Sequence, residues 1–178
     1  MKIEHILPAD IERRSMEIIE GELGPIELPP DEKDIIKRVV HTSADFDYVR
    51  NLRFSEGAVR KALEALKAGC TIVTDTNMAC MGISKPGLTK LGCQKVCFMA
   101  DDDVAAAARE QGTTRAQASM DKAAGLTGPL IIAVGNAPTA LLRLKELIDQ
   151  GKIAPALIIG VPVGFVNVEY AKDVIMEA

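Results

Sequence analysis

Aromatic residues and histidine are scarce in this sequence of 178 residues. Tryptophan is absent, aromatic residues make up 3% of the chain, and only two histidines are present. A stack of aromatic side chains that reads exposed bases is therefore disfavoured, and a folded core must be aliphatic. An excess of positive charge is absent too, because 21 Lys and Arg stand against 25 Asp and Glu, which gives a net charge of −4. This balance argues against a general nucleic-acid-binding protein.

Long apolar segments and leader sequences are also missing. The apolar run at residues 130–134 is too short to span a bilayer. Residues 1–5 show neither the apolar core nor the cleavage site of a signal peptide. We therefore expect a cytoplasmic protein that makes no contact with a membrane.

Metal-binding patterns are weak. The four cysteines, at positions 70, 80, 93 and 97, show no Cys-x-x-Cys spacing, and two histidines cannot complete a familiar zinc site. Cys70 and Cys97 lie in apolar runs, which favours buried small hydrophobic residues over a redox or metal role. The acidic residues 101–103 invite a metal interpretation, but acids at a helix N-terminus compensate its dipole. We expect them to cap a helix, and we predict no metal site.

The composition that is present, with 48% hydrophobic and 26% charged residues, is typical of a globular protein, and the length predicts one domain over residues 1–178. Apolar periodicity predicts N-terminal helices near residues 11–21 and 35–41. After Gly69, β-rich runs at 70–74, 94–100, 129–134 and 155–161 each precede a helical pattern. Repeated strand, turn and helix predicts an α/β fold with an open, mostly parallel, Rossmann-like sheet, helices on both faces and the N-terminal helices packed alongside.

Ligands of such sheets bind beyond the carboxyl ends of the strands. The segments that fall there are residues 75–78, 100–114, 135–139 and 162–166. In Gly135-Asn136-Ala137-Pro138-Thr139, the glycine permits close approach of the backbone to a ligand, and the proline fits the first turn of a helix. This combination is typical of an anion site at a helix N-terminus. Taken alone, these residues favour the alternative in which Thr139 only caps its own helix.

Two histidines and several arginines are candidates for chemistry. His41 follows the apolar stripe of a helix, where it acts either as a proton donor or only as a partner of the helix dipole. His5 is the weaker candidate. Arg14, Arg38 and Arg115 are taken singly as surface groups, whereas arginines that converge would bind carboxylates in a fixed two-pronged geometry.

Several segments, read in order, resemble the precorrin-8X methylmutases of cobalamin biosynthesis. The resemblance extends from about Pro8 to Lys172 and is carried by Arg14-Ser15, Arg38-Val39-Val40-His41-Thr42 with Asp45-Phe46, Asp75-Thr76-Asn77-Met78, Thr114-Arg115, Gly135-Asn136-Ala137-Pro138-Thr139-Ala140-Leu141 and Gly160-Val161-Pro162-Val163-Gly164-Phe165-Val166. The stretch from His41 to Asp47 is most similar to the cobalt-precorrin-8 branch of the family.

The resemblance implies an isomerase without a cofactor, in which any cobalt is carried by the substrate. It implies transfer of a methyl group from C11 to C12 of a corrin precursor, with His41 as the group that protonates or hydrogen-bonds a ring nitrogen. It also implies a homodimer with the site near the subunit contact. The implied substrate-binding residues are Arg14, Ser15, Thr42, Asp75, Met78, Thr114, Arg115, Asn136, Ala137, Thr139, Val163 and Phe165. With this substrate, we expect the backbone N–H groups of Ala137, Thr139 and Ala140 and the Thr139 hydroxyl to bind a ring carboxylate.

One departure from the family pattern concerns the C-terminus. Family members continue past the last predicted helix into a further strand with a Gly-rich, Arg-containing stretch, whereas this sequence ends at Ala178. We therefore expect that strand to be absent, which would leave a sheet edge unprotected. It also keeps a second interpretation open, a non-catalytic tetrapyrrole carrier of the same fold. A nucleotide-dependent α/β enzyme is the third, and it lacks any phosphate-loop glycine pattern.

Overall fold

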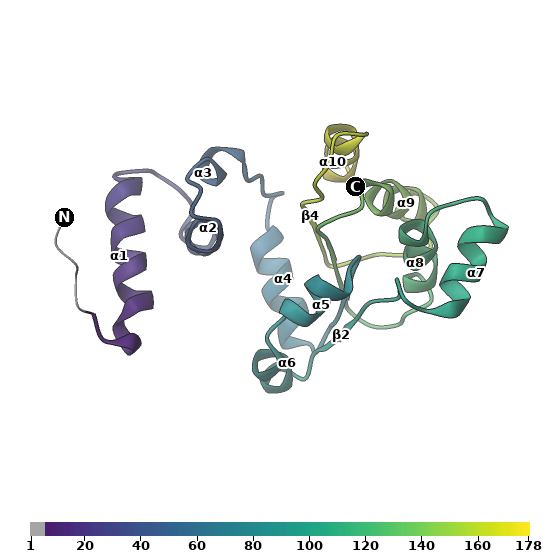
Figure 1. The fold of residues 1–178 in the computed structure, drawn as a ribbon, viewed down its shortest axis with the longest axis horizontal. Helices are drawn as coiled ribbons and strands as arrows, with labels where there is room; N and C mark the ends of the chain where they lie inside the picture. Colours follow the sequence, from purple (N-terminus) through teal and green to yellow (C-terminus); the bar gives the residue numbers. More distant parts are fainter. Residues whose placement is uncertain (1–5) are drawn as a thin grey trace. The chain divides into compact units, whose positions relative to one another are not determined.

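The computed structural model describes residues 6–178, which form two compact units that meet in the sequence between Val59 and Arg60 (Figure 1). The predictions about His5 and about a leader in residues 1–5 lie outside the described residues. The single domain over residues 1–178 and the packing of the N-terminal helices against the sheet stay predictions.

The first unit is helical. It contains the short 3-10 helix η1 (Pro8–Asp10) and the helices α1 (Ile11–Leu23), α2 (Pro30–Ser43) and α3 (Tyr48–Asn51). Proline at the first position of α2 has the backbone angle that a helix needs there. The unit has a small core of its own, made by buried side chains of α1 and α2, namely Ile19, Leu23, Ile36 and Val40. The two predicted N-terminal helices are confirmed, and α3 was not predicted.

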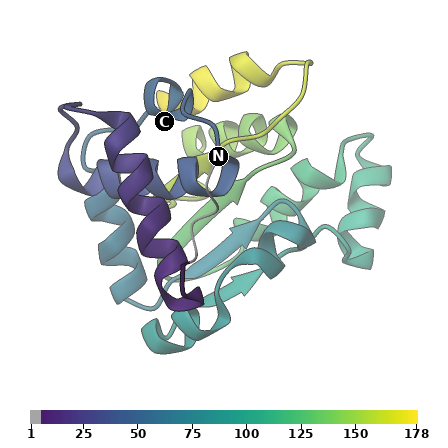
Figure 2. The ribbon, with the colours of Figure 1, turned by 60° about the vertical axis from the view of Figure 1, so that its left-hand side comes forward.

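The second unit is built on a four-stranded sheet. Its strands are β1 (Thr71–Thr74), β2 (Gln94–Val96), β3 (Leu130–Val134) and β4 (Leu157–Gly160). They follow the order β2-β1-β3-β4, and every pair is parallel (Figure 2). The predicted parallel sheet is confirmed. The run predicted at residues 94–100 forms only a three-residue strand, because the chain leaves the sheet after Val96 and its next side chains pack against the core.

Helices cover both faces of this sheet, as predicted. The helices of the unit are α4 (Ala58–Lys67), α5 (Asn77–Gly82), α6 (Lys85–Leu91), α7 (Asp102–Glu110), α8 (Arg115–Ala123), α9 (Pro138–Asp149) and α10 (Val168–Met176), of which α7 packs on α8. Side chains of β3 alternate between two cores. Ile132 and Val134 pack with residues of α8, α9 and α10, whereas Ile131 packs with Ala65 of α4 and Leu88 of α6. Alternation of this kind is what a strand buried on both faces requires.

The cysteines are unpaired, and the two at the start of neighbouring strands are buried. The Sγ atoms of Cys70 and Cys93 lie 3.9 Å apart, and burial raises the pKa of the Cys70 thiol to about 11. The interpretation of Cys70 as a small core residue is confirmed, whereas Cys97 is only half-buried. Over residues 6–178, no helix has the length and apolar character needed to cross a membrane.

Candidate active site

The predicted site residues of the second unit gather at the carboxyl ends of the strands. Residues 75–78 follow β1, residues 135–139 follow β3, and residues 161–167 follow β4. The turn between α7 and α8 contributes Thr114 and Arg115. Two sets of hydrogen bonds join three of these segments. One set starts from Asp75 and the other from Thr114.

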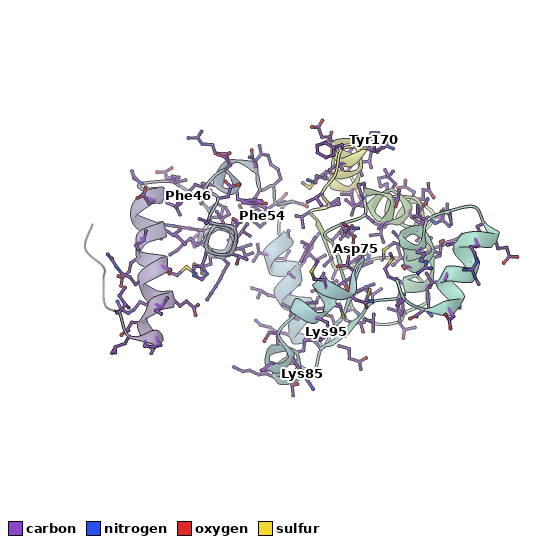
Figure 3. All side chains as sticks on the ribbon, in the orientation of Figure 1. Phe46, Phe54, Asp75, Lys85, Lys95 and Tyr170 are labelled. Atoms are coloured by element: carbon purple, nitrogen blue, oxygen red, sulfur yellow. The ribbon has the colours of Figure 1, made fainter. Side chains whose placement is uncertain are left out.

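Asp75 lies at the end of β1, inside the second unit, and has no exposed surface (Figure 3). Its Oδ1 atom accepts a hydrogen bond from the N–H of Gly135 at 3.0 Å. Its Oδ2 atom accepts from Asn136 at 2.8 Å and from Ala137 at 2.7 Å. The backbone N–H of Asp75 donates to the carbonyl of Ala133 at 3.2 Å. The loop after β3 therefore does form an anion site, and the anion is a carboxylate of the protein itself.

This arrangement corrects the predicted binding of a substrate carboxylate by backbone groups of the loop. The N–H of Ala137 donates to Asp75, and the N–H of Ala140 donates to the carbonyl of Ala137 at 3.0 Å. Neither donor is available to a ligand, so the prediction is wrong for both. The direct contact of the Asp75 side chain with substrate is not supported either, because a fully buried carboxylate reaches a ligand only through the loop that it holds.

Thr114 and Thr139 are brought together from segments 25 residues apart. Their Oγ1 atoms lie 3.1 Å from each other. Thr114 also begins α8 with a capping box, in which its Oγ1 accepts from the N–H of Gln117 at 3.2 Å and its own N–H donates to the Gln117 side chain at 3.3 Å. Gln117 was missed, although the spacing Thr-x-x-Gln is the known signature of such a box. Thr139 is not a cap, because Ala137 occupies the N-cap position of α9.

Large apolar side chains lie exposed on the segments that follow β1 and β4. Met78 on α5 is 84% exposed, and Phe165 has its whole side chain in solvent. Val163 is exposed as well, whereas the neighbouring Pro162 is buried and anchors the segment. Gly164 adopts a φ of 138°, which an L-side chain rarely permits, and this turn sets Phe165 outward. Exposed apolar groups next to polar ones are typical of a ligand or partner surface.

The other predicted residues belong to the first unit. His41 is exposed on the last turn of α2, which ends at Ala44 in the left-handed region. Thr42 donates its hydroxyl to the carbonyl of Arg38 at 3.0 Å, and Ser15 donates to the carbonyl of Ile11 at 2.9 Å. The structure thus places both hydroxyls in helix back-bonds. The catalytic role of His41 stays a prediction.

Arg14 of the first unit and Arg115 of the second are exposed to different degrees. The Arg14 guanidinium lies 3.6 Å from a carboxylate oxygen of Glu17, one turn further along α1, and its side chain is half-exposed. Arg115 stands at the first position of α8 with its side chain exposed, next to Thr114. Their roles in binding carboxylates stay predictions.

The acidic residues 101–103 do lie at the N-terminus of α7, as predicted, but the predicted side-chain cap is not formed. Asp101 occupies the N-cap position without a side-chain capping bond, and it binds Lys122 Nζ at 2.7 Å, as does Asp103. Hydrogen bonding to the lysine lowers the pKa of Asp103, and the two carboxylates raise the pKa of Lys122. The cluster ties α7 to α8. Within residues 6–178, no group of three or more His, Cys, Asp or Glu could hold a metal ion.

Comparison with known proteins identifies the family. The family model described as precorrin-8X methylmutase matches residues 10–178. The chain belongs to the precorrin-8X methylmutase family. The cobalt-precorrin-8 methylmutase of Leptospira interrogans is 41% identical over 173 residues, which cover 96% of this chain and 79% of that protein. The precorrin-8X methylmutase of Pseudomonas aeruginosa is 35% identical over 165 residues, which cover 93% of this chain and 79% of that protein.

A solved structure gives the same result for the fold. The precorrin-8X methylmutase of Thermus thermophilus superimposes with a TM-score of 0.86 at 42% identity. The match covers 96% of this chain and 82% of that one. The family expected from the sequence segments is confirmed, and so is the fold class.

Proposed function

We propose that this chain is a methylmutase that moves a methyl group from C11 to C12 of precorrin-8 or its cobalt form in cobalamin biosynthesis. The observation that carries the proposal is the family match over residues 10–178. The relatives that it matches are named as methylmutases, in both the cobalt-precorrin-8 and the precorrin-8X forms. This favours an isomerase over a non-catalytic carrier of the same fold.

The carboxyl-edge residues of the second unit suit a ring with carboxylate side chains. Arg115 offers a guanidinium, and Thr139 offers a hydroxyl next to Thr114. The Asn136 side chain is exposed on the same loop, beside residues whose N–H groups are held by Asp75. The exposed Met78, Val163 and Phe165 would cover apolar ring surface. In the first unit, Arg14, Ser15 and Thr42 are further proposed substrate-binding residues.

His41 is the proposed proton donor. The rearrangement breaks the bond from the methyl carbon to C11 and forms one to C12, so it needs a rigidly held ring rather than a nucleophile. Protonation of a ring nitrogen near the migrating methyl would polarise the conjugated system, and the proton would return to His41 afterwards. An imidazole suits this role because its ordinary pKa lies close to neutral pH. The reaction as proposed uses no cofactor or metal of the protein, and cobalt enters only within the substrate.

We further propose a homodimer located in the cytoplasm. The exposed apolar side chains of Val161 and Val166, on the same segment as the proposed ligand contacts, support a contact with a second subunit near the site. Four unpaired cysteines suit a reducing compartment. Light scattering during size-exclusion chromatography would test the dimer, and a mass of one chain at micromolar concentration would contradict it.

The enzymatic proposal is tested by anaerobic incubation of the protein with precorrin-8 or cobalt-precorrin-8 while the visible spectrum is followed. An isomerase converts a molar excess of substrate and releases the product, so the spectral change exceeds one equivalent per chain. A carrier yields a static complex of at most one equivalent. The second result would contradict the proposed function.

A further inference from the structure

We propose that Asp75 is a positioning residue that acts on the substrate through the loop at residues 135–137. The inference rests on the proposed function, because it assigns a role within the same site. Three consecutive backbone N–H groups point at one carboxylate, with distances between 2.7 and 3.0 Å. A carboxylate only accepts hydrogen bonds, so each oxygen suits these donors, and bonds to a charged acceptor are the strong ones.

The carboxylate stands on a rigid base. Asp75 follows β1 directly, and its N–H continues the β1–β3 ladder by donating to Ala133. The preceding Thr74 is also fully buried and donates its hydroxyl to the carbonyl of Thr76 at 2.9 Å. Asp75 therefore joins the ends of two neighbouring strands. Side chains that are themselves locked by packing and hydrogen bonds hold a site more accurately than loops do.

The loop held by Asp75 leads directly to the groups proposed for binding. Asn136 donates its N–H to Asp75 while its side chain is exposed, and Thr139 stands two residues beyond Ala137. The bond from Ala137 fixes the residue at which α9 begins. Asp75 thereby sets where the Thr139 hydroxyl meets Thr114. It also fills the positive N-terminal end of α9, so that ring carboxylates are directed to the side chains of this edge rather than to the backbone.

The first test is hydrogen exchange of the ligand-free protein, which does not depend on activity. Gly135 and Asn136 are exposed residues, yet we expect the amides of residues 135–137 to be protected from exchange in the wild-type chain because they donate to Asp75. In Asp75→Asn, the side-chain amide can no longer accept at both positions, and the same amides are expected to exchange at least tenfold faster. Rapid exchange of these amides in the wild type would overturn the inference even if the variant does not fold.

The second test compares steady-state turnover of Asp75→Asn with Asp121→Asn, a matched acid-to-amide change. Asp121 lies near the C-terminal end of α8 and accepts a bond from Arg143 of α9 at 2.8 Å, and it is not one of the residues proposed to bind substrate. We expect kcat/KM of Asp75→Asn to fall about 100-fold, as for a misplaced binding group, with most of the loss in KM. Asp121→Asn should retain wild-type constants. Faster amide exchange at residues 135–137 of Asp75→Asn together with an unchanged KM would overturn the inference. An inactive wild-type protein would instead contradict the proposed function.

Discussion

The hydroxyl oxygens of Thr114 and Thr139 lie 3.1 Å apart, and each belongs to the N-terminal turn of a different helix. The two residues are not equivalent. Thr114 caps α8 and accepts from Gln117, whereas Thr139 stands inside the first turn of α9 and caps nothing. This pair joins the α7–α8 turn to the loop after β3, which brings two separate parts of the sequence to one edge of the sheet.

The pair allows stability and binding to be separated. Thr114→Val removes a capping bond and should lower the free energy of unfolding by about 1 kcal/mol. Thr139→Val should cost less than half of that, because no cap is lost, but it should weaken binding of substrate or product. Chemical denaturation and ligand titration of both variants check this. A larger stability loss in Thr139→Val than in Thr114→Val, with unchanged binding, would contradict the assignment.

Phe165 is expected to matter for binding and not for folding. Its side chain is wholly exposed, so Phe165→Ala should change the free energy of unfolding by less than about 0.5 kcal/mol. If the ring of the substrate covers this side chain, the same change should weaken binding by about 1.5 kcal/mol, or roughly tenfold in Kd. Titration with the macrocycle would measure it.

A matched control for Phe165 is Tyr170→Ala. Tyr170 is 63% exposed and lies on α10, outside the proposed binding set (Figure 3). Tyr170→Ala should leave ligand affinity unchanged. Equal affinities for both variants and the wild type would remove Phe165 from the site.

His41 is expected to act in turnover rather than in binding. Because it is exposed on the last turn of α2, His41→Ala should fold normally and bind substrate, while kcat should fall about 10²- to 10⁴-fold. His41→Gln separates the two possible roles, since its amide can donate a hydrogen bond but cannot transfer a proton. Single-turnover measurements on substrate-loaded protein check both variants, and wild-type turnover in His41→Ala would exclude His41 from the mechanism.

The stability of the first unit should depend on pH through Glu20. Hydrogen bonds from Lys33 and Lys37 lower the pKa of Glu20 from 4.5 to about 2. A carboxylate whose pKa is depressed by folding stabilises the folded state above the unfolded value, and the contribution disappears as pH falls from about 4.5 through about 2. The melting temperature of Glu20→Gln should therefore lie below that of the wild type at pH 7, and the gap should close towards pH 2.

Salt and a neighbouring residue provide the controls for Glu20. The ion pairs are only partly buried, with 44% of the Glu20 side chain exposed, so 1 M salt should shrink the gap at pH 7. Glu22 lies on the same helix, and no ion pair of Glu22 is found within residues 6–178. The melting temperature of Glu22→Gln relative to the wild type should therefore show no such pH dependence. A constant gap for Glu20→Gln between pH 7 and pH 2 would refute the assignment.

The sheet and its helices could be predicted because their signals are local. Continuous apolar runs such as Leu130–Val134 and the glycines and prolines at their ends indicate buried parallel strands with short turns. The family could also be recognised, since its segments occur in order along the chain. The predicted length of β2 was wrong because Phe98 and Met99 continue the apolar run but pack against the core after the strand has ended.

The connections within the site could not be predicted, because they depend on partners far apart in the sequence. Nothing local to Asp75 shows that it accepts from residues 60 to 62 positions away. The N–H groups of the Gly135–Thr139 turn were therefore taken as free for a ligand. In the same way, the helix N-terminus at Asp101 gave no sign of Lys122 on the following helix. The capping box of Thr114 and Gln117, in contrast, is a missed feature with a readable local signal.

The position of the methyl group in the product tests the central claim most directly. Substrate carrying a ¹³C-labelled methyl at C11 would be incubated anaerobically with the wild-type chain, and the released ring would be analysed by NMR. The proposed function predicts that the label is found on C12, in more than one equivalent per chain. Recovery of the ring with its label still on C11 would contradict it.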